Sequence, residues 1–264
     1  MLAVPERAVA AATTNGRTPK AAVRDYWETQ PCGTTLSKAP LASPEFFDEV
    51  ERRRYQAEPF IRDFAEFSAW RGKTILEVGT GIGSDFVNFV RGGALAVGTD
   101  LTPAAINLVR RRLAAQNLRS PTLVADAESL PFAEHSFDLV YSWGVLHHTP
   151  DTGRAVREVH RVLRPGGQAR IMLYSRRSWV AVGLWLRHAL ARGRPDRTLS
   201  DVLSRHLESP GTQAFTGREI RRLFDSFSSV SLCTFVTPYD RQVAGPLTRL
   251  LPAGFFIGVV ATRD

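Results

Sequence analysis

Residues 74–83, Thr-Ile-Leu-Glu-Val-Gly-Thr-Gly-Ile-Gly, constrain the fold more than any other segment of this chain. The apolar residues Ile75, Leu76 and Val78 predict a buried strand. The strand runs directly into a turn with a glycine at every second position, which lets the backbone turn tightly and approach a ligand closely. Glu77 stands near the carboxyl end of the strand, where open α/β sheets bind ligands, and its charge suits an ammonium group better than a pyrophosphate.

Four further apolar runs predict additional strands of the same sheet, at residues 94–99, 121–125, 136–142 and 168–174. The first of these is followed by Asp100 and the second by Asp126. A carboxylate at the end of the second strand of a βαβ unit is placed to hold both hydroxyls of a ribose. Either aspartate alone is equally compatible with a helix cap. The series of polar residues at one sheet edge predicts a ligand crevice.

Five motifs in order resemble the class I S-adenosylmethionine-dependent methyltransferases, and most of all the small-molecule branch similar to ubiquinone and menaquinone methyltransferases. The motifs are residues 77–83, Asp100, and residues 126–132, 136–140 and 163–167. The resemblance is strong over roughly residues 70–174 and loose to residue 264. It implies a Rossmann-like α/β fold with a seven-stranded, mostly parallel sheet, helices on both faces, and S-adenosyl-L-methionine as cofactor.

The resemblance also implies roles for individual residues. Glu77 and the glycine loop would face the methionine portion of the cofactor, and Asp100 would take the ribose hydroxyls. Asp126 and the backbone of Ala127 would meet the adenine. The whole cofactor-binding set is then expected to be Glu77, Gly79, Thr80, Gly81, Gly83, Asp100, Leu101, Asp126, Ala127, Trp143 and Gly144. Many members carry aspartate where this chain has Glu77, a difference that preserves the charge.

Candidates for a general base are His147 and His148, which follow the fourth predicted strand. Histidine suits proton removal because its free pKa lies near neutrality, although either residue could instead pack or cap a helix. Tyr26 is a further catalytic candidate and, like Tyr174, could orient an acceptor hydroxyl. His206 or Glu208 could also enter the site from a later insertion. A carbon, thiolate or unprotonated amine acceptor would need no strong base.

The chain divides into five expected regions: a disordered tail at 1–20, an N-terminal helical lid at 21–72, the cofactor-binding core at 73–174, a helical insertion that roofs the acceptor pocket at 175–215, and the C-terminal part of the core sheet at 216–264. Tyr26 and Trp27 would bring the first helix over the crevice, where it would exclude water. The alternative is a helix that merely packs on the sheet edge. The stretch 179–190, flanked by arginines, could roof the pocket or touch a membrane surface or a second subunit.

Composition narrows the function further. The formal charge is +8, almost entirely from arginine. Three arginine groups, at 52–54, 110–112 and 221–222, are expected to be solvated helix faces. Nucleic acid is an unlikely partner, because no separate nucleic-acid-binding module is present. Two cysteines argue for a reducing, cytoplasmic location and against a metal site. No apolar run is long enough to span a membrane.

The sequence therefore predicts methyl transfer from S-adenosyl-L-methionine to a small-molecule acceptor, plausibly in specialised or quinone-like metabolism. Two alternatives remain open. An RNA or protein methyltransferase is favoured by the net charge and disfavoured by the missing recognition module. A non-catalytic S-adenosylmethionine-binding protein would keep the cofactor residues without turnover. The methylated atom and the oligomeric state are not specified by any residue.

Overall fold

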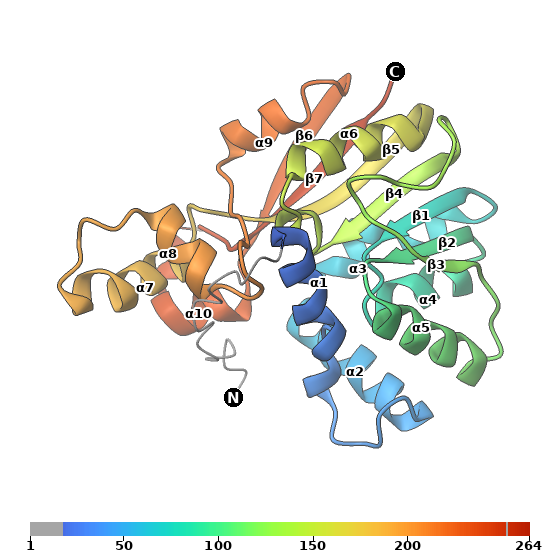
Figure 1. Ribbon diagram of the computed structural model, residues 1–264, viewed down its shortest axis with the longest axis horizontal. Coiled ribbons are helices and arrows are strands. Elements are labelled where there is room, and N and C mark those ends of the chain that lie inside the picture. The colour runs from blue at the N-terminus through green and yellow to red at the C-terminus, as the bar shows by residue number, and fades with distance from the viewer. Residues whose placement is uncertain (1–17, 252) are drawn as a thin grey trace.

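A seven-stranded sheet forms the centre of the computed structural model, which describes residues 18–251 and 253–264 (Figure 1). The strand order is β3-β2-β1-β4-β5-β7-β6. All neighbouring strands are parallel except β7, which runs antiparallel to both β5 and β6. The strands are β1 Thr74–Val78, β2 Leu95–Asp100, β3 Thr122–Val124, β4 Phe137–Trp143, β5 Leu163–Tyr174, β6 Ser229–Phe235 and β7 Phe256–Thr262.

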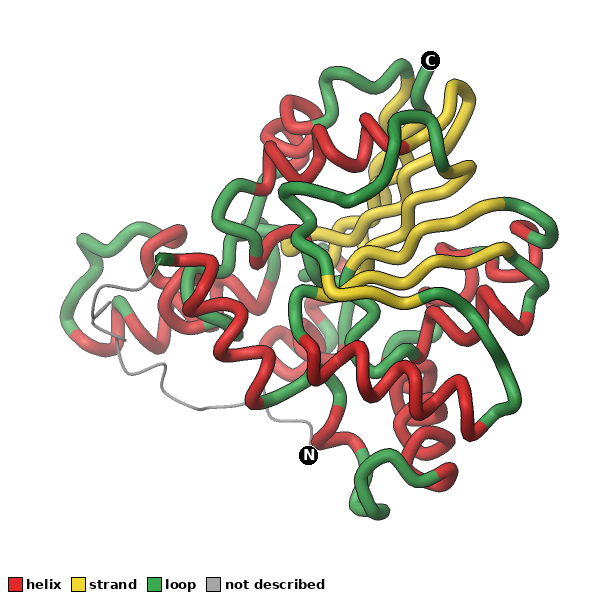
Figure 2. The backbone as a smooth tube through the Cα atoms, turned by 45° about the vertical axis from the view of Figure 1, so that its right-hand side comes forward, coloured by secondary structure: helices red, strands yellow, loops and turns green. Residues whose placement is uncertain are grey.

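Helices cover both faces of the sheet (Figure 2). Successive strand residues point to opposite faces, so Ile75 and Leu139 pack with α4 and α5, whereas Leu76 and Val140 pack with α6 and α9. Both strand faces are buried, as in other sheets built from βαβ units. The helices in the described residues are α1 Pro19–Thr29, α2 Pro44–Ala57, α3 Phe60–Ala65, α4 Ser84–Arg91, α5 Pro103–Ala115, α6 Thr152–Val162, α7 Trp179–His188, α8 Leu199–His206, α9 Gly217–Leu223, α10 Pro238–Ala244 and α11 Leu247–Leu250.

The predicted fold class is confirmed, including the number of strands and the helices on both faces. The structure differs from expectation at the start of β5 and in the segment before β7. The fifth strand begins at Leu163 rather than at residue 168, because residues 163–167 form an irregular start of β5 with a register shift against β4. No structure was predicted for residues 237–254, where α10 and α11 lie.

The N-terminal boundary also shifts. Residues 1–17 of the expected tail lie outside the described residues. The side chain of Thr18 caps α1 by accepting a hydrogen bond from the amide of Ala21, and Pro19 occupies the first helical turn. Both features favour helix initiation, so Pro19 and Lys20 belong to a helix rather than to a tail.

A helical lobe projects to one side of the sheet (Figure 1). It contains α7 and α8 from the predicted insertion, with α10 packed against α7. The side chain of Asp240 in α10 accepts a hydrogen bond from the amide of Val180 in α7, at 3.4 Å. None of the helices in the described part of the chain has the length and apolar character that a membrane crossing requires.

Candidate functional site

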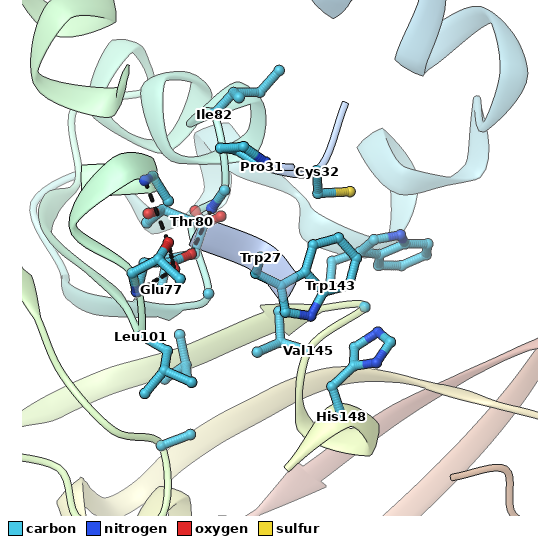
Figure 3. Close-up of a pocket in the computed structure, with 18 of the residues that line it drawn as sticks. Trp27, Pro31, Cys32, Glu77, Thr80, Ile82, Leu101, Trp143, Val145 and His148 are labelled. Atoms are coloured by element: carbon cyan, nitrogen blue, oxygen red, sulfur yellow. Dashed lines mark hydrogen bonds between the residues drawn. The ribbon is translucent and has the colours of Figure 1, made fainter. Parts of the chain in front are cut away.

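A pocket opens at the carboxyl ends of β1, β2 and β4, where the strand order changes direction (Figure 3). This switch point is where open α/β sheets bind ligands. The pocket has an empty volume of about 1170 Å³, open solvent at its mouth included. Glu77 and Thr80 lie toward one end, and Trp143 and His148 toward the other (Figure 3). Eleven of the fourteen predicted site residues line it; the exceptions are Gly83, Tyr26 and His147.

The glycine loop lies at the end of β1. The amides of Gly79 and Thr80 donate to the carbonyl of Thr99, at 2.7 and 3.0 Å. Gly79 has φ of 81°, and a Cβ there would come within 2.2 Å of Val145, so only glycine fits. Gly83 serves helix packing instead, because it precedes α4 with φ of 77° and a Cβ there would meet Val109 at 3.1 Å. The loop glycines therefore divide between forming the pocket wall and seating α4 against α5.

Glu77 brings a buried carboxyl group to the pocket. Its side chain is 3% exposed, and its Oε2 atom has no hydrogen-bond partner in the described residues. Burial, with the nearby charge of Asp85, raises the pKa of Glu77 well above its usual range, and Arg54 only partly opposes this shift. A buried carboxylate without a partner is costly, and a bound ammonium group would satisfy it.

Asp100 is held rigidly at the end of β2. One of its carboxylate oxygens accepts a hydrogen bond from the amide of Gly81 at 3.0 Å. The other accepts from the amide and the hydroxyl of Thr102, at 3.0 and 2.9 Å. Burial raises the pKa of Asp100, and these hydrogen bonds limit the rise. The fixed carboxylate beside the glycine loop fits a pair of ribose hydroxyls.

Helix α1 lines the pocket on the side of the loop that follows β3. Lys20 forms ion pairs with Asp126 at 2.5 Å and with Glu128 at 2.7 Å. The carboxylate of Asp126 also accepts a hydrogen bond from the amide of Glu128, at 2.9 Å. Lys20 and Glu128 were not predicted as site residues, because no local pattern links α1 to a loop more than a hundred residues away.

The other end of the pocket is lined by aromatic rings. Trp27 of α1 and Trp143 of β4 both line the pocket, and the centroid of the Trp27 ring lies 5.2 Å from that of His148. Tyr26 packs edge-on against Trp27, at 4.9 Å, and does not line the pocket. Cys32 lines the pocket and is exposed, yet the protein around it and the charge of Glu208 raise its pKa to about 12. The thiol is therefore neutral at physiological pH.

The two neighbouring histidines have different surroundings. His147 is fully buried behind the pocket, with its ring 3.8 Å from that of Tyr174. Burial, with the nearby His148, lowers the pKa of His147 well below its usual range, so this ring stays neutral. His148 lines the pocket and contacts residues 208–212, near the end of the insertion. Its Nδ1 atom is 2.9 Å from the hydroxyls of both Ser209 and Thr212.

Glu208 completes the surroundings of His148. Its Oε2 atom lies 3.3 Å from His148 Nε2 and accepts a hydrogen bond from the hydroxyl of Tyr174, at 2.8 Å. Burial alone would raise the pKa of Glu208, but His148 and Tyr174 outweigh it and hold the pKa below its usual range. A carboxylate therefore faces one ring nitrogen of His148, and two hydroxyl oxygens face the other.

Two arginines expected on solvated faces are structural. Arg112 is completely buried in α5, where it forms an ion pair with Glu51 and donates to the hydroxyl of Ser84 at 2.9 Å. Arg54 lines the pocket and pairs with Asp85, at 2.7 Å. The expectation was wrong for both because a carboxylate on another element, half-buried at Glu51 and buried at Asp85, offsets each charge.

The pocket fits the cofactor that the sequence resemblance implies. S-adenosylmethionine carries an ammonium and a sulfonium, and the pocket offers the unpartnered Glu77 together with aromatic rings that attract cations. Asp100, which the resemblance assigns to the ribose, and Asp126 and Ala127, which it assigns to the adenine, line the same pocket. The chemical character of the lining residues suits one nucleoside ligand with an acceptor molecule beside it.

Comparison with known proteins gives an independent assignment. Residues 76–171 match the family model described as a methyltransferase domain. Demethylmenaquinone methyltransferase of Clavibacter sepedonicus is 30% identical over 151 residues, covering 53% of this chain and 61% of that protein. Phthiotriol/phenolphthiotriol dimycocerosates methyltransferase of Mycobacterium leprae is 42% identical over 98 residues, 36% of each chain. The chain spans less than half of the length of the first curated relatives that it matches.

A solved structure supports the fold over nearly the whole chain. Magnesium protoporphyrin IX methyltransferase from Synechocystis PCC 6803, with bound S-adenosylmethionine, has a TM-score of 0.61. The two share 14% sequence identity, over 96% of this chain and all of that chain.

Proposed function

This chain belongs to the class I S-adenosylmethionine-dependent methyltransferases, and we propose that it transfers the methyl group of this cofactor to a small-molecule acceptor. The observation that carries the proposal is the unpartnered carboxylate of Glu77, which lies with the fixed Asp100 in one pocket. Two relatives are named for methylation of demethylmenaquinone and of phthiotriol dimycocerosates, which supports an acceptor of this size class. A role in quinone-like or specialised metabolism remains part of the proposal.

The walls of the pocket also favour a small acceptor. Trp27 and Trp143 line the end that lies away from the adenine loop, and α1 is tied across the pocket by Lys20. An aromatic-lined site beneath a helix suits a ring or an apolar group and keeps water from the reacting atoms. We therefore propose α1 as the lid.

The cofactor supplies an electrophilic methyl group with its own leaving group. The chain has to align the acceptor, keep the site dry and, for a protonated acceptor, remove a proton. We assign proton removal to the pair formed by Glu208 and His148. His148, which lines the pocket, takes the proton, and its protonated ring would be held by Glu208, Ser209 and Thr212.

The test combines binding with transfer. Calorimetry should detect S-adenosylmethionine binding, and cofactor with a labelled methyl group should label a small metabolite in an extract rather than its RNA or protein fraction. Label in RNA or protein would replace the small-molecule proposal, and cofactor binding without any labelling would indicate a non-catalytic protein.

The proposed proton acceptors are tested with the identified substrate. Glu208→Gln and His148→Ala should lower kcat by about 10²- to 10⁴-fold, the usual contribution of general base catalysis, while cofactor affinity stays unchanged. His135→Gln, which alters an exposed histidine away from the pocket, is the matched control. Unchanged rates in the first two variants would show that the acceptor needs no base.

A further inference from the structure

Exposed apolar residues concentrate on the helical lobe. Of ten large apolar side chains that are exposed in the described residues, seven lie on α7, on the turn that follows it, and on α10, α11 and Leu251. Scattered single residues of this kind need no explanation, but a continuous group marks a contact surface. We call these seven residues the lobe face: Val182, Leu186, Leu190, Val243, Leu247, Leu250 and Leu251.

The lobe face consists of two stripes that lie side by side. The first has Val182 and Leu186, one turn apart on α7, and Leu190 just after it; the second has Val243 on α10, Leu247 and Leu250 on α11, and Leu251 directly after α11. The segments meet closely, since a Cβ at Gly183 would come within 2.9 Å of Val243. The indole of Trp179 donates a hydrogen bond to the carbonyl of Leu251, at 3.0 Å, which joins the start of α7 to the end of α11.

Arginine provides nearly all of the charge around this face. Residues 175–196 contain five arginines and one acidic residue, Asp196, which pairs with Arg194 at 3.4 Å; Arg177, Arg187, Arg192 and Arg194 are exposed. In residues 237–251 the sole carboxylate is Asp240, which is completely buried as the capping residue of α10, whereas Arg241 and Arg249 are exposed. An apolar surface with an arginine rim is the composition of segments that lie at a lipid interface.

We propose that the lobe face docks this protein on the surface of a bilayer that contains anionic lipid. The leucines and valines would enter the boundary between headgroups and acyl chains, and the arginines would meet lipid phosphates. Charge decides between this partner and a second copy of the chain. Two lobe faces would bring together surfaces that each carry more arginines than carboxylates, whereas an anionic bilayer complements them. This inference does not depend on methyl transfer.

The test is cosedimentation of the full chain with vesicles. Binding is expected to vesicles of equimolar phosphatidylcholine and phosphatidylglycerol, and to be much weaker with phosphatidylcholine alone. Leu186→Ser and Leu250→Ser alter one residue in each stripe and should each weaken binding roughly tenfold or more, because 45% and 76% of these side chains are exposed and would become buried in the bilayer. Arg241→Gln combined with Arg249→Gln should weaken it about 30-fold, from about 1 kcal/mol for each arginine.

Matched variants away from the lobe distinguish docking from general adhesion. Leu95→Ser alters an equally exposed leucine on β2, and Arg218→Gln with Arg222→Gln removes two exposed arginines near α9. Both should bind vesicles as the unaltered protein does. Equal losses in these controls, or equal binding to neutral vesicles, would overturn the proposal. A dimer would overturn it as well, if sedimentation showed that the dimer forms with increasing protein concentration, that Leu250→Ser abolishes it, and that the protein binds no vesicles. Cofactor affinity, measured in parallel, should be the same in all variants.

Discussion

At the scale of the residue, Glu77 carries an electrostatic cost that the cofactor would relieve. The pKa of Glu77 is raised in the folded protein, so the folded state loses stability as pH rises through that raised pKa. Below the ordinary pKa range of glutamate, the carboxyl is protonated in both the folded and the unfolded protein, and the electrostatic cost is absent. We expect Glu77→Gln to increase the free energy of unfolding of the cofactor-free protein at neutral pH and not at acid pH. The same change should weaken S-adenosylmethionine binding about 10- to 100-fold, from the loss of a charge-assisted hydrogen bond.

Thermal denaturation without cofactor and calorimetry with cofactor measure the two effects. Glu134→Gln, which removes an exposed carboxylate, is the control and should change neither. Unchanged affinity in Glu77→Gln would remove Glu77 from the cofactor site.

His147 should make stability depend on pH in the opposite sense. Its pKa is depressed in the folded protein, so the stability that its neutral ring allows is fully present above the unfolded value of about 6.5 and is lost as pH falls toward the folded value. We expect His147→Phe, which keeps a ring against Tyr174, to reduce the slope of unfolding free energy with pH by up to about 1.4 kcal/mol per pH unit. Denaturant titrations between about pH 5 and 8 measure the slope. An unchanged slope would mean that the ring is protonated in the folded state.

At the scale of the element, α1 is joined to the far side of the pocket through the ion pairs of Lys20 with Asp126 and Glu128. These ion pairs are partly exposed, so each is worth less than about 1 kcal/mol. We expect Lys20→Gln to accelerate cofactor dissociation roughly two- to fivefold, with little change in the stability of the cofactor-free protein. Stopped-flow displacement of the cofactor gives the rate. Arg24→Gln, on an exposed position of the same helix, should leave it unchanged; equal rates in both variants would show that α1 is not held by Lys20.

The elements that could be predicted are those marked by a pattern within their own segment, such as an apolar run or a helix cap. The apolar run at residues 74–78 identifies β1, and Thr216 with Glu219 forms the predicted capping box of α9. Contacts between distant elements could not be predicted, because a sequence pattern does not say which helices meet. Arg112 illustrates this limit: it looks like its solvated neighbours Arg110 and Arg111, but its partner Glu51 lies 61 positions away on α2.

At the scale of the whole molecule, opposite charges are separated. Carboxylates gather in the pocket, at Glu77, Asp100, Asp126 and Glu128, whereas arginines dominate the lobe. A pocket of negative potential draws a cationic cofactor toward it. The positive lobe attracts anions. The protein can therefore bind a cationic ligand in the pocket and an anionic surface at the lobe.

The position of β7 has a consequence for biosynthesis. This strand is hydrogen-bonded to β5 on one side and to β6 on the other, although both precede it in the chain. While the ribosome is still making residues 256–262, β5 therefore has an unfilled edge, and β6 has no neighbour to join it to the sheet. An unfilled edge invites pairing with other chains. The nascent protein is thus most exposed to aggregation just before its final strand emerges, even though every residue of the glycine loop has already been synthesised.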